Sequence, residues 1–331
     1  MRKLLLTSSA LVAAASISSY AVADVSVTGA FEWKYIQQAA DQTSKDGDDF
    51  GTDNEIVISF SNKTDSGLTI GGKMEMGNYN DDTANTTAVI DESVLTISGG
   101  FGTFRLGNED SVHESFGITE VDLIDEEGNG RYTNNSISGN AGEQGSTDTN
   151  KIAYLTPAMG GFKAGISVED SGSGTAATDM TAMGASYTMP LADGSVTIKY
   201  NQSTKDGTND TDTTNMGAQF SMGAMSLIVS SMTKETGTTN DEEGTGFAIK
   251  YDMGGGMTIA ASTTEVEDTA TTSGGENEKY TANIGEVVYT VAPGLKAKVT
   301  YTDYEYKNGN ESKAAGDDSG QITNLTISAS F

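Results

Sequence analysis

After residue 23, no apolar run in the chain is long enough to cross a membrane as a helix, and apolar residues recur at every second position instead. A spanning helix needs about 20 consecutive apolar residues. A period of two is that of a β-strand, whose successive side chains point to opposite faces of the sheet. In residues 25–35 one face is Val25, Val27, Gly29, Phe31, Trp33 and Tyr35, and the other is Ser26, Thr28, Ala30, Glu32 and Lys34. This pattern predicts strands with one apolar and one polar face.

The same alternation repeats over about sixteen segments. Their predicted spans are 25–37, 53–63, 67–78, 88–99, 102–109, 149–156, 161–170, 178–189, 194–205, 212–222, 223–235, 243–253, 256–267, 277–291, 294–307 and 319–331. Tight turns alternate with longer, polar, acidic connections, of which 110–148 is the longest. This asymmetry is typical of transmembrane barrels with an even number of strands.

The alternative fold is a soluble β-sandwich or propeller. Its strands would be shorter, at about 5–6 residues. Its core would also have to bury the Ser, Thr, Lys and Glu side chains of the polar faces, which is costly without hydrogen-bonding partners. A water-filled lumen accommodates those side chains, and closure of the sheet removes the edges that lipid cannot satisfy. We therefore expect an all-β, up-and-down, antiparallel transmembrane barrel of sixteen strands.

The N-terminus has the features of an export signal. Arg2 and Lys3 precede an apolar run over 4–17, and Ala21-Val22-Ala23 precedes Asp24. A basic start, a short apolar segment and small residues at a cleavage site are typical of a secretory signal peptide. We predict a signal peptide over 1–23 and a barrel domain over 24–331.

Charge excludes one class of partner. The chain has 19 Lys and Arg residues against 47 Asp and Glu residues, for a net charge of −28. Such an excess repels nucleic acid and fits a surface bathed in divalent cations, such as a lipopolysaccharide layer. The absence of cysteine excludes disulfides and thiolate metal sites.

Four segments resemble the classical general-diffusion porins, the trimeric sixteen-stranded family of Gram-negative bacteria. They are the opening strand Val25–Phe31, the arm Gly102–Gly107 before the third long loop, the turn Tyr154–Phe162 after it, and the closing strand Asn324–Phe331. The resemblance implies a homotrimeric outer-membrane channel for passive diffusion of small hydrophilic solutes and ions, with its third loop folded into the lumen. The terminal Phe331 resembles the signal that the outer-membrane assembly machinery reads.

The residues of the long connection 110–148 support an inward fold independently. Loops of this length are usually functional or disordered. This one carries the apolar residues Phe116, Ile118, Val121, Leu123 and Ile124, which could pack on the inner wall. Its carboxylates could then line a constriction; they are Asp110, Glu114, Glu120, Asp122, Asp125, Glu126 and Glu127. The alternative is a flexible external loop. The tip motif of the family is reduced to Ser115-Phe116-Gly117, so the resemblance does not fix the geometry of the constriction.

Basic side chains are expected on the lumen wall, because a charge facing mid-membrane lipid costs about 2–4 kcal/mol. By the alternation, the inward bases include Lys34, Lys73, Arg105, Lys151, Lys163, Lys199, Lys250, Lys296 and Lys298. In the family a row of wall bases faces the acids of the third loop; Lys34, Lys73 and Arg105 are the best candidates here. The alternative is local pairing with Glu32, Glu75 and Glu169. The acidic excess favours a weak preference for cations.

Other signals are weaker. Asp48-Asp49 and Asp317-Asp318 could hold Ca²⁺ through oxygen ligands, or they could be solvated loop residues. His113 is the one histidine, and the Ser231–Lys234 pair lacks the companion motifs of acylases. We therefore expect no enzyme. The rival functions are a substrate-specific channel of the same fold and a non-conducting structural or adhesive barrel, and single-channel conductance separates all three.

Overall fold

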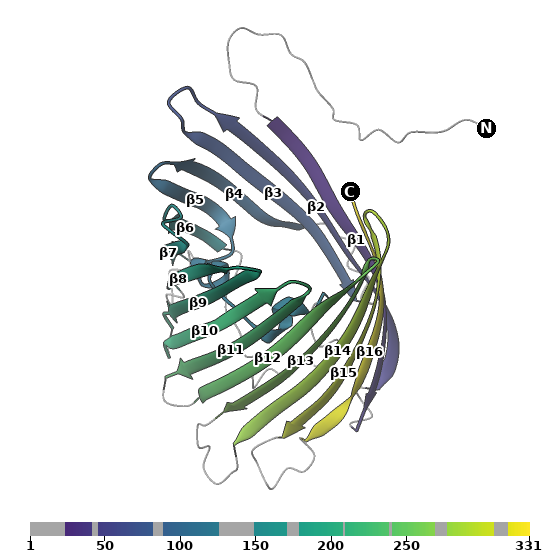
Figure 1. The fold of residues 1–331 in the computed structure, drawn as a ribbon. Helices are drawn as coiled ribbons and strands as arrows, with labels where there is room; N and C mark the ends of the chain where they lie inside the picture. Colours follow the sequence, from purple (N-terminus) through teal and green to yellow (C-terminus); the bar gives the residue numbers. More distant parts are fainter. Residues whose placement is uncertain are drawn as a thin grey trace, which may run out of the picture.

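Sixteen strands form one closed antiparallel barrel, in which every strand pairs with its sequence neighbours and β16 pairs with β1 (Figure 1). The computed structural model describes residues 24–41, 46–81, 89–125, 149–170, 179–207, 209–237, 240–268, 277–307 and 317–331. The prediction of a sixteen-stranded all-β barrel is confirmed. The predicted signal peptide lies outside the described residues and stays a prediction.

The strands are β1 (Asp24–Ala40), β2 (Gly47–Lys63), β3 (Thr69–Asp81), β4 (Val89–Gly99), β5 (Gly102–Glu109), β6 (Thr149–Leu155), β7 (Phe162–Glu169), β8 (Met180–Leu191), β9 (Gly194–Lys205), β10 (Thr211–Met222), β11 (Met225–Thr236), β12 (Asn240–Gly254), β13 (Met257–Asp268), β14 (Glu278–Ala292), β15 (Leu295–Lys307) and β16 (Asp318–Ser330). Two single helical turns, α1 (Val112–Ser115) and η1 (Glu120–Leu123), follow β5. In the part of the chain that the structure describes, no helix is both long and apolar enough to cross a membrane.

The largest error in the predicted bounds is at β2, which begins at Gly47 rather than at residue 53. The acidic, glycine-containing sequence there is typical of a loop. In the structure it pairs with β1, where Gln37 lies opposite Asp48 and Ile36 opposite Asp49. Strand pairing therefore overrides the weak local β-propensity of these residues.

Most apolar side chains face outward and most polar ones inward, which is the reverse of a soluble core, although an inward apolar cluster that includes Met232, Tyr280 and Ile322 is buried inside the barrel. Val27 and Ile198 are about half exposed on the outer face, at 55% and 52%, whereas the inward Lys34 is 6% exposed. The pairing keeps this parity around the barrel, since Lys34 lies opposite Thr326 and Thr326 opposite Lys298. The outer face is therefore suited to lipid and the inner face to water.

Short turns gather at one end of the barrel, the short-turn end, and long connections at the other, the long-connection end. The turn between β12 and β13 has φ values of 75°, 65° and 83° at Gly254, Gly255 and Gly256. Only glycine adopts such a run of positive φ without strain. The chain can thus reverse within three residues at this end.

The C-terminal residue completes the closure of the barrel. The Phe331 N–H donates to the Gly29 carbonyl at 3.0 Å, and the Gly29 N–H donates to the Phe331 carbonyl at 3.1 Å. A Cβ on Gly29 would lie 2.7 Å from the Phe331 ring. The ring therefore occupies the space that a side chain at position 29 would need.

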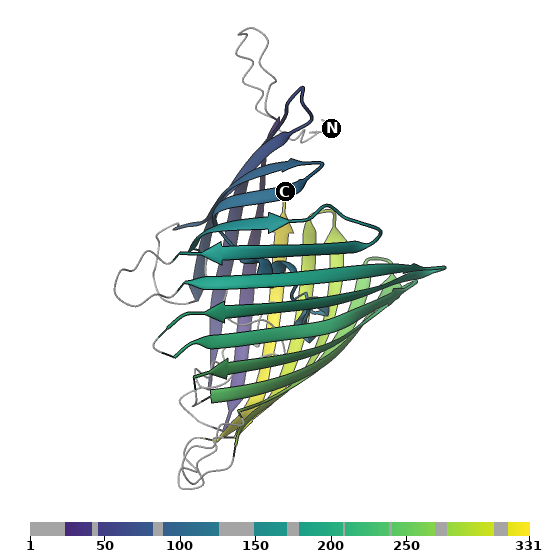
Figure 2. The same cartoon turned by 90° about the vertical axis from the view of Figure 1, so that its left-hand side faces the viewer.

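Strand length varies around the barrel. The strands β5, β6 and β7 have 8, 7 and 8 residues, whereas β1 and β2 have 17 each. Figure 2 shows the long, oblique strands β9–β12 beside the shorter ones. The barrel wall is therefore lower on the side formed by β5, β6 and β7 than on the side formed by the longer strands.

Candidate functional site

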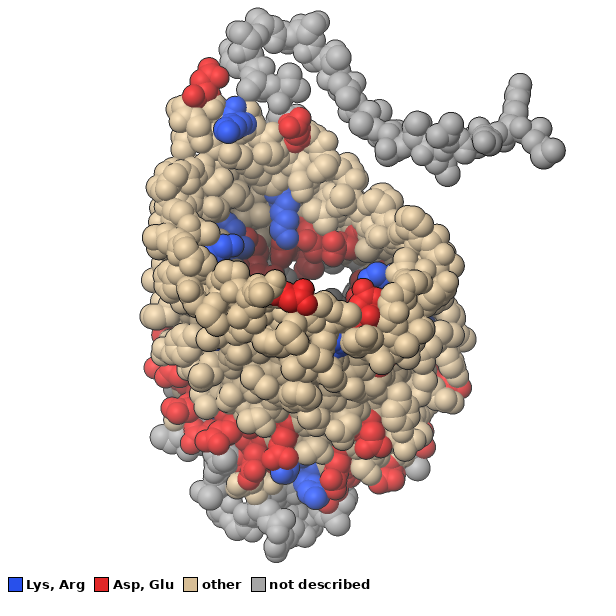
Figure 3. Space-filling model, in the orientation of Figure 1, with Lys and Arg blue, Asp and Glu red and all other residues tan. Residues whose placement is uncertain are grey.

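The candidate site is the lumen. Figure 3 shows the molecule hollowed, with acidic and basic residues on the walls of the hollow. Residues 110–125, called here the inner segment, leave β5 and contact the inward faces of successive strands from β7 to β15. The inner segment therefore runs along one side of the wall. The rest of the long connection, 126–148, lies outside the described residues, so the inward fold of the complete loop stays a prediction.

The inner segment is first fixed at α1. The Ser111 side chain caps the helical turn by accepting a hydrogen bond from the His113 N–H at 3.2 Å. The Val112 N–H donates to Ser167 Oγ on β7 at 3.0 Å. Val112 and Phe116 are buried against Ala153 of β6. The predicted packing of Phe116 on the inner wall is thus observed.

Inward-facing glycines make room for the inner segment on the wall. A Cβ on Gly184 of β8 would lie 2.6 Å from Cβ of Phe116, and one on Gly165 of β7 would lie 2.9 Å from its ring. A Cβ on Gly217 of β10 would lie 2.6 Å from Ile118. Any larger residue at these positions would push the segment toward the channel axis.

Asn215 of β10 holds the backbone of the inner segment. Its Oδ1 accepts from the Ile118 N–H at 3.0 Å, and its Nδ2 donates to the Ile118 carbonyl at 3.0 Å. Lys199 of β9 donates from Nζ to the Gly117 carbonyl at 2.7 Å. These bonds satisfy backbone groups that would otherwise be buried without partners.

Glu120 faces the wall and not the channel. It is fully buried, and it accepts hydrogen bonds from Ser230 Oγ at 2.9 Å and from Thr264 Oγ1. A Cβ on Gly246 of β12 would lie 2.0 Å from Glu120 Oε2. The expectation that Glu120 lines the constriction is therefore not met, because the wall offers it two hydroxyl donors and a glycine-sized space.

Asp122 is the acid of the inner segment whose side chain water reaches most freely. Its carboxylate accepts from the Thr119 N–H at 3.2 Å in a capping box at the start of η1. Water reaches one side of the carboxylate, while the wall and segment around its other sides desolvate it in part and raise its pKa above the ordinary value. The Thr119 N–H and the nearby Lys199 offset part of that rise, and Glu120 adds to it.

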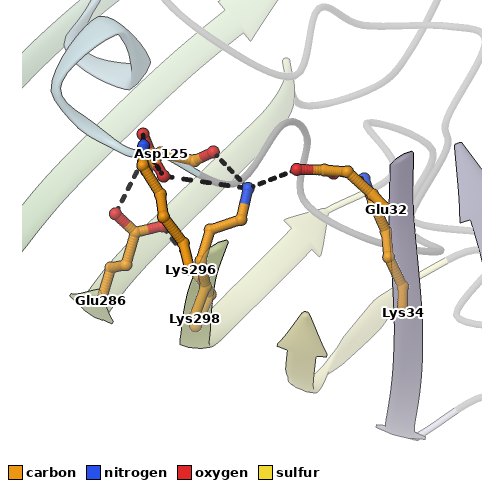
Figure 4. Close-up of polar contacts among 7 residues, drawn as sticks. Glu32, Lys34, Asp125, Glu286, Lys296 and Lys298 are labelled. Carbon is orange, nitrogen blue, oxygen red and sulfur yellow. Dashed lines mark hydrogen bonds and ion pairs between the residues drawn. The ribbon is translucent and has the colours of Figure 1, made fainter. Parts of the chain in front are cut away.

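The inner segment ends at an ionic cluster that joins it to β14, β15 and β1 (Figure 4). The Asp125 N–H donates to Glu286 Oε1 at 2.7 Å, and its carboxylate pairs with Lys296 at 3.1 Å. Lys298, whose side chain is 4% exposed, donates to the Asp125 carbonyl at 2.9 Å and pairs with Glu32 at 2.9 Å. Asp125 is thus bound to wall bases on its own side of the lumen.

Lys34, Lys73 and Arg105, the best candidates for the wall row, and the further wall base Lys151 form local ion pairs. Lys34 pairs with Glu32 at 3.3 Å, Arg105 with Glu109 at 3.0 Å, Lys151 with Glu169 at 3.6 Å, and Lys73 with Glu75 at 3.3 Å and also with Glu92. Arg105 also donates to Ser115 Oγ of the inner segment at 3.1 Å. Of the two interpretations left open by the sequence, the geometry favours local pairing. Lys163, also predicted on the wall, forms no ion pair within the described residues.

The remaining predicted acids contribute less. Asp110 and Glu114 are partly exposed at the start of the inner segment. Glu126 and Glu127 lie outside the described residues.

Strand alternation bears on the possible calcium ligands and on the Ser231–Lys234 pair. Asp48 and Asp49 lie on opposite faces of β2, and Asp318 is buried facing inward, where it accepts from the Tyr304 hydroxyl at 3.2 Å. Ser231 faces outward and Lys234 inward on β11. Asp48 and Asp49 therefore do not point toward one another, and Ser231 and Lys234 cannot act together. Calcium binding at the aspartate pairs stays a prediction.

Sequence reasoning missed the wall residues that hold the inner segment. The inward glycines and Asn215 each interrupt an alternating pattern with a small or polar residue, which is also what a water-filled lumen tolerates. No local signal distinguishes the two cases, because the partner residues lie about a hundred positions away in the chain.

The comparisons with known proteins agree with this architecture. The family model described as Gram-negative porin matches residues 7–309. No curated protein matches the chain.

Three solved structures illustrate the similarity. The anion-selective porin from Comamonas acidovorans has a TM-score of 0.70 at 16% identity, over 94% of this chain and 100% of that one. A loop-deletion mutant of OmpT, an outer membrane protein of Vibrio cholerae, has a TM-score of 0.68 at 12% identity, over 93% and 99%. A mutant of the Rh. blastica porin has a TM-score of 0.66 at 16% identity, over 93% and 100%. At these identities the likeness shows the fold, and the family match extends over most of the chain. This protein therefore belongs to the Gram-negative porin family.

Proposed function

We propose that the chain forms a water-filled channel for passive diffusion of small hydrophilic solutes and ions across the outer membrane of a Gram-negative bacterium. The observation that carries the proposal is the course of the inner segment. It is bound along the wall from β7 to β15 by hydrogen bonds from one strand after another. A polar wall opposite a fixed constriction sets size and charge preference without a moving part.

A weak preference for cations is part of the proposal. The described inward acids outnumber their basic partners on β2–β4, where Glu55, Glu75 and Glu92 lie around Lys73 and Asp53 lies near Glu55. Asp122 adds a carboxylate that water reaches. The anion-selective relative shares 16% identity and does not fix the sign for this chain.

Conductance in planar bilayers tests the function. We expect large steps at about 1 M salt that are linear in voltage, because charges are then screened within about 3 Å. In a salt gradient the reversal potential should indicate a small excess of cation flux. No steps at all would support the structural or adhesive barrel and contradict a channel.

The substrate-specific channel is the second candidate. Sugar and phosphate channels need aromatic or arginine rows along the lumen, and Arg105 is the one arginine in the described strands. Concentration-dependent block of the current by one solute class, with none from others of the same size, would favour this candidate over general diffusion.

We also propose a homotrimer. A tilted strand needs about 9–11 residues to cross the hydrocarbon, and β5, β6 and β7 have 8, 7 and 8. Apolar side chains such as Phe104 and Ile152 nonetheless face outward there, at 40% and 59% exposure. A second protomer would cover this low side of the barrel. Chemical cross-linking of the purified protein in mild detergent should give a trimer band that heating abolishes; a monomer alone would contradict the proposal.

The export steps complete the proposal. Cleavage after Ala23 would leave Asp24 at the N-terminus of the mature chain, which N-terminal sequencing tests directly. The outer-membrane assembly machinery would read the terminal Phe331, and the acidic outer loops would meet lipopolysaccharide through divalent cations.

A further inference from the structure

Inward charges follow an order along the strands. On most strands with inward charges of both signs, the base lies nearer the short turn and the acid nearer the long connection. These base and acid pairs are Lys63 and Glu55 on β2, Lys73 and Glu75 on β3, Arg105 and Glu109 on β5, Lys163 and Glu169 on β7, and Lys250 and Glu242 on β12. On β1 the order is reversed, because Glu32 lies nearer the short-turn end than Lys34.

Bases predominate in the short-turn half of the lumen. Lys163 and Lys250 face inward near their turns and form no ion pair within the described ranges. Lys296 and Lys298 stand at the short-turn end of β15. The inward acids of this half include Glu32, which pairs with Lys298, Glu286, and Asp252, whose carboxylate accepts from the Gly254 N–H at 2.8 Å.

Acids predominate in the long-connection half. Glu242, Asp268, Glu278 and Asp318 face inward at the long-connection ends of β12, β13, β14 and β16. Glu242, Asp268 and Asp318 are buried there, whereas Glu278 is partly exposed. Among the described bases, Lys234 forms an ion pair with this group, to Glu242 at 2.8 Å. In Figure 3 further acidic residues gather along the lower edge, where these strands end. On the outer face of β12 and β15, Asp241, Glu243, Asp303 and Glu305 add acidic side chains.

We propose that the lumen is electrically bipolar along its axis and that the channel therefore rectifies ionic current, with Lys163 and Lys250 determining the anion-accepting half. The inference rests on the proposed channel function. Charged rings concentrate ions of the opposite sign. Two such zones in series make conductance depend on the direction of the field.

The direction follows from the order of the zones. When the long-connection side is positive, cations enter through the acidic half and anions enter through the basic half. Both then accumulate where the halves meet, and conductance is high. With the opposite polarity, each ion must first enter the zone that repels it, so that both are depleted and conductance falls.

Salt concentration controls the size of the effect. The screening length is about 30 Å at 0.01 M salt and about 3 Å at 1 M. At low salt it exceeds the spacing of neighbouring strands, and the two zones act as continuous rings. We therefore expect a current ratio between polarities of about 1.5 or more at roughly 0.01 M salt, falling to about 1 at 1 M.

The experiment needs channels of known orientation. The chain has no cysteine, so Ser66→Cys in the turn after β2 gives one thiol at the short-turn end. Biotinylation and a streptavidin cap keep that end on the side to which the protein is added. Current is then compared at equal and opposite voltages, in low and high potassium chloride.

Variants identify the residues responsible. Lys163→Gln with Lys250→Gln should bring the low-salt ratio to about 1 and shift the reversal potential toward cations. The matched control is Lys205→Gln, an inward base without an ion pair at the long-connection end of β9. It removes one positive charge from the acidic half, whereas the double variant removes two from the basic half, and it should preserve or increase the ratio.

The outcomes are distinguishable. Equal currents at both polarities in low salt would overturn the inference and leave the channel function intact. An unchanged ratio in the double variant would exclude Lys163 and Lys250 as its determinants. A protein that gives no current at 1 M salt would instead remove the proposed function itself.

Discussion

Gly246 shows how one missing side chain can position a loop that lies far away in sequence. Its inward face holds the Glu120 carboxylate, which is fully buried against Ser230. The buried charge is tolerated because hydroxyl groups donate to it, since an unpaired buried carboxylate would be far more costly. The wall and the inner segment are therefore complementary in shape and in hydrogen bonding.

Gly246→Ala should destabilise the barrel by about 1–3 kcal/mol, the usual range for overpacking a tight site. The new Cβ would lie 2.0 Å from Glu120 Oε2 and 2.6 Å from Ser230 Oγ, so the inner segment must move. Denaturant unfolding in lipid vesicles, followed by the fluorescence of the single tryptophan, measures the loss. Gly285→Ala is the control, because a Cβ there meets nothing within 4 Å; equal effects would contradict the tight fit.

Asp122 should make ion selectivity depend on pH. Its raised pKa means that the carboxyl gains a proton at a higher pH than an ordinary aspartate, which titrates near about 3.9. The lumen then loses one negative charge while its lysines stay charged. The cation preference should fall as pH decreases from neutral toward that range, as measured by reversal potentials in a salt gradient. In Asp122→Asn the portion of the change due to this group should disappear; an identical pH profile would show that other carboxyls control it.

At the scale of elements, the inner segment is held by side chains from many strands. Ser167, Lys199, Asn215, Ser230 and Glu286 each come from a different strand, and each bonds to a different part of the segment. Such a distributed attachment resists local detachment of the inner segment from the wall, because the loss of one hydrogen bond leaves the others in place. The ionic cluster at Asp125 is the last contact of this series within the described residues.

Lys298→Met should release the end of the inner segment. Lys298 is nearly buried between Asp125 and Glu32, and removing one partner of a buried ion pair costs about 3–5 kcal/mol. We expect lower stability to denaturant and more frequent brief closures in single-channel records at high salt. Lys307→Met is the control, since Lys307 and Glu305 are both more than half exposed and such pairs contribute at most about 1 kcal/mol. If closures in the Lys298 variant were as rare as in the wild type, the end of the inner segment would be held without Lys298.

At the scale of the whole molecule, closure of the sheet gives the alternating strands a continuous outer surface for lipid and a continuous inner surface for water. Apart from register shifts on β3, β12 and β14, inward residues pair with inward neighbours around all sixteen strands, and β1 meets β16 with the same parity. A closed sheet leaves no unpaired edge in lipid. The same alternation fixes which charged side chains point into the lumen and at what height along its axis. Single substitutions can therefore change the proposed order of charges.

Neighbouring positions on one strand should therefore differ completely in their access to water. The chain lacks cysteine, so Thr197→Cys and Ile198→Cys each give one reporter on β9. A membrane-impermeant thiol reagent should modify Cys at 197 in the lumen, at least about tenfold faster than Cys at 198, which faces lipid. Similar rates at both positions in vesicles would contradict the parity on which the fold depends.

The sequence by itself determined the class of fold, most strand bounds and the inward direction of the bases, because a period of two and the cost of charge in lipid act locally. It also indicated that residues such as Phe116 and Ile118 pack on a wall. Only the tertiary structure decided that Glu120 turns away from the channel and that Lys73 and Arg105 pair with neighbouring acids. These outcomes depend on which strands become neighbours and where glycine leaves space, and such information is distributed over distant parts of the chain.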